Sequence, residues 1–305
     1  MDTNLLKYRA FITTVDCGSF TRAAETLGYA QSSISKMIAD LEAEWKVLLL
    51  ERSRAGVQPT SDGLSMLPYA RELLNSYQKV QEQAASLSGI ATGLIRIGTF
   101  SSVATHWLPR IIRQYQRVFP GIRYELLLGD YDEIEQWIFE GRVDCGFLRL
   151  PTRPDFEVIS LEKDEYVAVL PSDHPLTEKD TLAPPDLDDQ PFMLLEHGGK
   201  TEVSAFLEKY QVQPDIRFTT WDDYAILSMV ESGLGLGILP RLILNRIPYN
   251  VEVRSFSAPF YREIGLAMRS MNTASASVRK FIEYLEYRNS DSPNTDFILI
   301  SNQKD

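Results

Sequence analysis

The first 45 residues carry hydrophobic positions at helical spacing in three successive segments. Residues 4–16 form the first, with inward positions at Leu5, Tyr8, Ile12 and Val15. The second ends at Gly28, because glycine readily adopts the positive φ that helix ends favour. The third covers residues 31–45, and its apolar stripe is Ile34, Ile38, Leu41 and Trp45. This pattern predicts three helices, the last two joined by a tight turn.

The outer face of the third predicted helix carries short polar side chains and one cation. These residues are Gln31, Ser32, Ser33, Ser35 and Lys36. Such side chains can enter a major groove and bond base edges or phosphates, which is how a helix-turn-helix reads DNA. An ordinary pair of antiparallel helices with a solvated polar face gives the same pattern. These residues alone leave both interpretations open.

Residues 47–60 lose the helical spacing. An apolar triplet is followed by a basic tip that contains Gly56, and then by Val57 and Pro59. This order predicts two strands joined by a turn, which would form a wing beside the third helix. Arg54 near the tip could reach a minor groove, since narrow A·T tracts attract arginine.

Residues 61–88 return to a helical pattern. The apolar positions recur near 3.5-residue spacing at Leu67, Ala70, Leu74, Tyr77, Ala84 and Leu87. A helix of this length extends about 40 Å, which is too long to bury on a small winged domain. We expect it to pair with a copy of itself as a coiled-coil arm. The alternative is a spacer that lies on the next domain.

After residue 93 strands and helices alternate. Strands at 94–99, 122–128 and 143–148 enclose helices at 103–119 and 131–141, which predicts a parallel sheet with helices on both faces. A second lobe follows, with strands at 166–170, 191–195, 216–219 and 235–239 and helices at 201–210 and 223–233. The strand at 264–268 and the helix at 274–288 have no partner there, so we expect them to complete the first lobe. Two such lobes enclose a cleft, a common place for a small ligand.

The predicted fold class is therefore a multidomain α+β and α/β protein. Residues 1–60 would form a winged helix-turn-helix, and 61–90 a linker and dimerisation helix. Residues 91–164 and 265–290 would form lobe 1, and 165–264 lobe 2. The polar tail, 291–305, has no readable role.

The net charge of −11 argues against a generally basic nucleic-acid coat. Residues 1–60 hold seven basic and seven acidic residues, so phosphate attraction must come from a local face. The candidate cations are Arg22, Lys36, Arg52 and Arg54.

Neither the two cysteines nor the three histidines have metal-ligand spacing. Cys17 and Cys145 are interpreted as reduced structural thiols, with a redox switch as the alternative. No cofactor is predicted. Because there is neither a signal-peptide pattern nor an apolar run of membrane-spanning length, we expect a cytoplasmic protein with no membrane partner.

Several motifs in fixed order resemble one family, the LysR-type transcriptional regulators, over about residues 5–288. They are AAETLGYAQSSISKMIADLE, V-x-P-T-x-x-G ending at Gly63, GLIRIGTF, F-P-G, VDCGFLR, and V-x-x-G-L-G-L-G-I-L-P ending at Pro240. The resemblance implies a winged helix-turn-helix, a linker-helix dimer and an effector domain that resembles a periplasmic solute-binding protein. Family members are typically tetramers in which a small molecule in the cleft changes DNA bending and transcription.

The resemblance also implies partners and DNA contacts. The expected partners are double-stranded DNA at a promoter or operator, a small-molecule effector, further copies of the chain forming a homodimer and then a homotetramer, and RNA polymerase. The family's DNA contacts map to Gln31, Ser32, Ser33, Ser35, Lys36, Arg52 and Arg54. Ser32 replaces the usual proline, Lys36 the usual arginine, Lys46 the usual glycine and Leu50 the usual phenylalanine. These departures put the base preference, but not DNA binding, in question.

Effector contacts are expected where strands end and helices begin. Thr99, Phe100, Ser101 and Ser102 open the first helix of lobe 1, where exposed N–H groups suit a carboxylate, although Ser101 or Ser102 could simply cap the helix. Family position adds Gly129, Phe147, Glu196, His197 and Trp221. Glu196 and Asp222 would repel an anion or bind an amine.

No catalytic motif supports an enzyme. The sequence has no G-x-S-x-G, phosphate loop or H-E-x-x-H, and the carboxylates near the predicted cleft have no identified acid–base partner. A solute-binding protein for transport would require export, which the N-terminus does not indicate. We therefore expect a ligand-responsive DNA-binding regulator that is not an enzyme.

Overall fold

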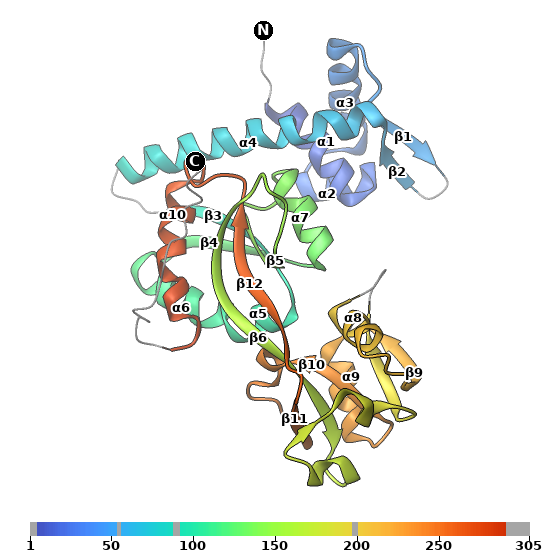
Figure 1. Cartoon of the computed structure of the whole chain (residues 1–305). Helices are drawn as coiled ribbons and strands as arrows, with labels where there is room; N and C mark the ends of the chain where they lie inside the picture. The colour runs from blue at the N-terminus through green and yellow to red at the C-terminus, as the bar shows by residue number, and fades with distance from the viewer. Residues whose placement is uncertain (1–4, 54–55, 88–91, 197–200, 291–305) are drawn as a thin grey trace.

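The computed structural model describes residues 5–53, 56–87, 92–196 and 201–290. It consists of an N-terminal helical unit, a long helix and two α/β lobes (Figure 1). Within these ranges, no helix is both long enough and apolar enough to cross a lipid bilayer.

The N-terminal unit contains three helices and a two-stranded antiparallel hairpin. The elements are α1 Leu5–Cys17, α2 Phe20–Leu27, α3 Gln31–Trp45, β1 Leu50–Ser53 and β2 Gly56–Pro59. Ser19 caps α2 by accepting a hydrogen bond from the backbone N–H of Arg22, and Gly28 ends the helix with a φ of 72°. Fully buried members of the common core include Phe11, Ile34, Leu41 and Leu49. The winged helix-turn-helix predicted from the sequence is confirmed.

Helix α4, Ser61–Leu87, connects this unit to the lobes. Leu67 is buried in the N-terminal core, and Arg71 pairs with Asp16 of α1 at 2.6 Å. Further along, the Asn75 side-chain amide donates to the carbonyl of Gly141 in lobe 1 at 3.0 Å. Within one protomer α4 is therefore a spacer packed on both domains, and part of its expected dimerisation stripe is buried internally.

Lobe 1 is built on parallel strands. Its first elements are β3 Thr92–Thr99, α5 Ser101–His106, α6 Leu108–Val118, β4 Gly121–Leu128, α7 Tyr131–Phe139 and β5 Cys145–Leu150. Strand β3 pairs parallel with both β4 and β5. Gly98 and Gly146 face each other in register beneath α7, where an added Cβ would lie 2.9 or 2.6 Å from the Cγ2 of Ile134. The two glycines let α7 lie close to the sheet, which fixes where this helix begins.

One sequence prediction for lobe 1 is wrong in detail. The single helix expected at 103–119 is two helices that meet at Trp107, because Pro109 lacks an N–H donor and tolerates only the first turn of a helix. The strand expected at 122–128 is present as β4, although not all of its apolar side chains are buried. Leu126 and Leu128 are 45% and 53% exposed, since β4 is the edge strand of the sheet.

Lobe 2 repeats the parallel arrangement. Its main elements are β8 Pro191–Leu195, α8 Glu202–Lys209, β9 Asp215–Thr220, α9 Asp223–Glu231, β10 Leu236–Pro240 and β11 Val251–Phe256, with the short segments η1 Pro175–Glu178, β7 Thr181–Leu182, η2 Pro184–Leu187 and η3 Arg241–Leu244. Strand β8 lies parallel to β9 and β10. Two separate cores cover the faces of this sheet, one around Phe192 and Phe206 and the other around Ile226 and Ile243. Strands β7 and β11 were not anticipated from the sequence.

Two long strands join the lobes. Strand β6, Glu157–Pro171, pairs antiparallel with β12, Phe260–Met268, and both run from one lobe into the other (Figure 1). As a result one sheet, in the order β4-β3-β5-β12-β6-β10-β8-β9, passes through both lobes. Beyond β12, α10 Ala276–Glu283 and η4 Tyr284–Arg288 pack into the core of lobe 1. Any change in the angle between the lobes must bend these two strands.

Candidate functional site

Helix α3 presents a polar outer face. Gln31, Ser32 and Lys36 are exposed, and Ser33 and Ser35 are half-buried. Ile34 and Ile38 on the opposite face are buried, which fixes the rotation of the helix. Figure 1 shows α3 on the side of the N-terminal unit remote from the two lobes.

The hairpin beside α3 is tied to it. One oxygen of Glu42 accepts hydrogen bonds from the backbone N–H groups of Leu49 and Leu50, at 2.8 and 3.2 Å. The backbone of Arg52 lies in β1 opposite Val57 of β2. Arg54, which the sequence assigns to the tip, lies outside the described residues. The first strand of the hairpin is therefore anchored to α3 through Glu42.

A cleft of about 340 Å³ lies between the lobes. Lobe 1 contributes Phe100, Ser101, Leu128, Gly129, Asp130, Tyr131, Asp132 and Arg149, lobe 2 contributes Leu195, Glu196, Thr201, Glu202, Val203, Trp221 and Asp223, and the crossing strands contribute Tyr166 and Arg262. The volume falls within the range of small-molecule sites. Arg149 of β5 reaches across the cleft to Glu202 of α8, with 2.9 Å between Nη1 and Oε1.

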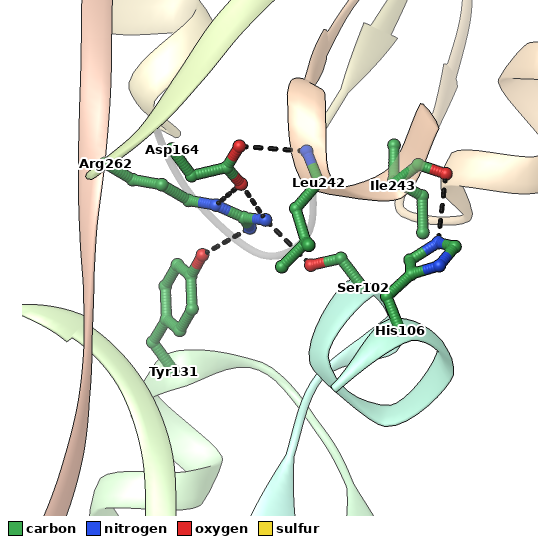
Figure 2. Close-up of polar contacts among 7 residues, drawn as sticks. All are labelled: Ser102, His106, Tyr131, Asp164, Leu242, Ile243 and Arg262. Atoms are coloured by element: carbon green, nitrogen blue, oxygen red, sulfur yellow. Dashed lines mark hydrogen bonds and ion pairs between the residues drawn. The ribbon is translucent and has the colours of Figure 1, made fainter. Parts of the chain in front are cut away.

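The floor of the cleft is a buried ion pair between the crossing strands. Arg262 of β12 and Asp164 of β6 face each other in register, and both side chains are 5% exposed. The Nε and Nη2 atoms of Arg262 donate to Oδ2 of Asp164 at 2.9 and 2.7 Å (Figure 2). Arg262 also donates to the hydroxyls of Ser102 and Tyr131 in lobe 1, at 2.7 and 3.0 Å. One guanidinium therefore orders the start of α5 and the start of α7.

Two further contacts connect this floor to lobe 2. The second oxygen of Asp164 accepts from the backbone N–H of Leu242 in η3 at 2.9 Å. A ring nitrogen of His106 in α5 lies 3.2 Å from the carbonyl of Ile243, also in η3 (Figure 2). Burial lowers the pKa of His106, and Arg246 and Arg110 lower it further. The imidazole is therefore mostly neutral at pH 7, with its Nε2–H donated to the carbonyl.

Asp223, which lines the cleft, has a raised pKa. It is 9% exposed, and burial raises its pKa from 3.8 to about 6, although Arg262 partly offsets the shift. Burial also raises the pKa of Tyr131 and of Tyr166, so both phenols stay neutral.

Five of the residues that the sequence assigns to the effector site line the cleft. They are Phe100, Ser101, Gly129, Glu196 and Trp221. Phe100, rather than Ser101 or Ser102, is the N-cap residue of α5. His197 lies outside the described residues.

Three assigned residues do not line the cleft. Thr99 is fully buried at the end of β3, and Ser102 is sealed beneath Arg262. Phe147 is also fully buried and packs against Trp107 in the core of lobe 1, with ring centroids 6.3 Å apart. Strand β5 is central and covered on both faces, so Phe147 points into the core.

The sequence analysis missed most of the charged and hydroxyl groups of the cleft. These are Asp130, Tyr131, Asp132, Arg149, Tyr166, Thr201, Glu202, Asp223 and Arg262. One signal was available, because Arg262 and the charged run that contains Asp164 each come just before an apolar, strand-like segment. Charges of opposite sign on two strands of one sheet are candidates for a buried pair.

A winged helix-turn-helix joined through a long helix to a two-lobed domain with a ligand-sized cleft defines a ligand-responsive transcriptional regulator. Residues 5–64 match the family model described as bacterial regulatory helix-turn-helix protein, lysR family. Residues 88–289 match the model for the LysR substrate binding domain. The chain belongs to the LysR family of DNA-binding transcriptional regulators, and its relatives are named as regulators rather than enzymes.

Similarity to known proteins extends over nearly the whole chain. It is 34% identical over 284 residues to the probable regulator LrrA of Synechococcus elongatus, covering 92% of this chain and 96% of that protein. It is 31% identical over 282 residues to the uncharacterised regulator YvbU of Bacillus subtilis, again covering 92% and 96%. Among solved structures, full-length OxyR from Pseudomonas aeruginosa superimposes with a TM-score of 0.73 at 25% identity, covering 95% of this chain and 98% of that one.

Proposed function

We propose that this LysR-family regulator reads its operator with α3 and the wing. The observation that carries the proposal is the polar face of α3, which is exposed, remote from the lobes and backed by a tightly packed core. Gln31, Ser32, Ser33 and Ser35 contact base edges, Lys36 contacts a base or phosphate, and Arg52 and Arg54 of the wing approach the adjacent groove.

The exposed side of α4 supports assembly into a dimer. Tyr69, Leu73, Val80 and Ala84 fall near the same line of the helix surface, and Tyr69 and Val80 are 69% and 63% exposed. Apolar side chains at this spacing pair with a second copy of the same helix. Two such dimers form a tetramer in the cytoplasm, contact RNA polymerase and span separated half-sites on the promoter.

The cleft supports control by a small molecule. Arg149–Glu202 crosses it, and the Arg262–Asp164 pair contacts both lobes at its floor. A ligand that touches both walls changes the preferred angle between the lobes by its differential affinity for the two arrangements. The ligand meets Phe100, Ser101, Glu196 and Trp221, together with the residues of the crossing strands.

DNA fragments selected from the parent genome by the full-length protein provide the test of the reading face. Lys36→Ala should weaken binding by about 1–3 kcal/mol and lower the slope of log affinity against log salt by about one, measured by fluorescence anisotropy. Lys209→Ala, an exposed lysine of lobe 2, is the matched control and should change neither quantity. Equal binding by the Lys36 variant and the wild type would show that α3 does not read DNA.

A further inference from the structure

The described lining of the cleft carries more carboxylates than cations. The carboxylates are Asp130, Asp132, Glu196, Glu202 and Asp223, and the cations are Arg149 and Arg262. Both cations already have anionic partners, since Arg149 pairs with Glu202 and Arg262 with Asp164. Neither guanidinium is available to an anionic ligand without losing its partner.

Three of the four helix N-termini at the cleft do little to balance this excess. Asp130 of α7, Thr201 of α8 and Asp222 of α9 each accept from the first N–H groups of their helix, whereas the six-residue α5 has no side-chain cap. Asp130 makes two hydrogen bonds with Glu133. Its carboxylate accepts from the backbone N–H of Glu133, and its own backbone N–H donates to the Glu133 carboxylate. The capped helix ends offer few donors to an anion.

Asp132, Glu196 and Asp223 line the cleft, and among the described residues none of the three forms a direct ion pair; Arg262 acts on Asp223 only through its charge. Asp223 is the most constrained of them. It is more than nine-tenths buried and borders the cavity, and its ionised form is favoured by its own backbone N–H and by the charge of Arg262, which is already paired with Asp164. A buried carboxylate of this kind destabilises the fold when it is ionised, unless a ligand or a proton neutralises its charge.

Glu196 and Asp223 lie on neighbouring parts of the same wall. They follow the adjacent parallel strands β8 and β9, and the backbone N–H of Glu196 donates to the carbonyl of Thr220 at 2.9 Å. Aromatic rings complete the surface. Phe100 contacts Tyr131 edge to face, and Trp221 lies at the mouth, 49% exposed. Ring faces attract cations as well as apolar groups.

Resting on the proposed control by a small molecule, we infer that the effector is a protonated amine with an apolar body. Its ammonium group lies between Asp223 and Glu196, and its apolar part packs against Phe100 and Trp221. An ammonium supplies the positive charge that neither carboxylate has in an ion pair, although Glu196 already accepts from the Ser204 hydroxyl at 3.0 Å. A carboxylate ligand would meet negative charge on this wall.

Two matched series of probes test this inference on the full-length protein. The first comprises 2-phenylethylamine, 2-phenylethanol and 3-phenylpropanoate, and the second hexylamine, hexanol and hexanoate. Binding is measured by thermal shift and by ligand-detected NMR. In each series we expect the amine to bind about tenfold more tightly than the alcohol, and the carboxylate to bind more weakly still, because a charged hydrogen bond to a buried partner is worth about this much.

Two variants test whether the preference for an amine depends on Asp223. Asp223→Asn should reduce amine affinity about tenfold and leave alcohol affinity unchanged, because it removes the charge and keeps the shape. Asp173→Asn, at an exposed turn, is the matched control. For the wild type, amine affinity should also fall as the pH drops below about 6, where Asp223 takes up a proton.

A carboxylate that binds more tightly than its amine, or an amine preference that survives Asp223→Asn, would overturn the inference and leave a ligand-controlled cleft intact. Failure of all six probes to bind at millimolar concentration would overturn it as well. The DNA measurements with Lys36→Ala decide the reading-face proposal separately, so the two failures are distinguishable.

Discussion

The polar face of α3 and the floor of the cleft are both rich in polar groups, but they are built in opposite ways. On α3 the polar residues come from two turns of one helix, and Gln31, Ser32 and Lys36 are exposed to solvent. At the cleft floor Arg262, Asp164, Ser102, Tyr131 and the N–H of Leu242 come from five separate elements and satisfy one another out of water. The face proposed to read DNA leaves several polar side chains open to solvent, whereas the Arg262–Asp164 pair between the lobes uses its hydrogen-bonding groups inside the protein.

The largest effect should come from breaking the buried pair. Arg262→Met leaves Asp164 buried without its cation and should lower the free energy of unfolding by about 3–5 kcal/mol, measured by urea denaturation. Arg217→Ala removes an exposed pair with Asp215, in which the side chains are 53% and 51% exposed, and should cost about 1 kcal/mol or less. Lys36→Ala should likewise change stability by less than about 0.5 kcal/mol. Similar losses in all three variants would remove the distinction between the two regions.

A smaller effect of opposite sign is expected at Asp223. Its pKa is raised from 3.8 to about 6, so the folded chain holds this proton more tightly than the unfolded chain. The ionised carboxyl therefore destabilises the fold fully above about pH 6, and the penalty disappears as the pH falls below 3.8. Asp223→Asn should raise the free energy of unfolding by about 1–3 kcal/mol at pH 7.5 and by little near pH 4. A gain of the same size at both pH values would contradict a titrating, buried Asp223.

The smallest effect is expected at the contact between His106 and Ile243. His106→Phe removes one hydrogen bond between the lobes and should cost about 1 kcal/mol at pH 7.5. The folded pKa of His106 lies below its ordinary 6.5, so the wild type loses stability as the pH falls below that value. The difference between the two proteins in urea denaturation should therefore shrink between pH 7.5 and pH 5.5. A difference that grows over this range would reverse our assignment of a neutral His106.

The same contrast explains what the sequence could predict. The polar face of α3 follows from the period of one helix, because Ile34 and Ile38 fix which side is buried. Strand β6 was expected only from residue 166, since residues 162–165 are all charged and interrupt the apolar alternation. Those residues lie where the strand leaves the core of one lobe and enters the other, so they face partners that are distant in the sequence.

Phe147 illustrates a second limit. Residues 145–148 of its strand carry no polar side chain longer than cysteine, as expected for a strand covered on both faces, so their pattern does not reveal which side chains point toward a cleft. Arg149, two residues further on, reaches the cleft from the same strand. Residue type identified the strand, but only the three-dimensional arrangement separates core positions from ligand-facing ones.

The residues around the cleft come largely from the turns that precede α5, α7, α8 and α9. The Arg262–Asp164 pair that contacts both lobes lies on β12 and β6. Substitutions in those turns can alter which molecule is sensed without disturbing the strands that carry the response. Sensing and transmission can therefore diverge independently among descendants of this chain, because loop-borne residues change more freely than the framework that supports them.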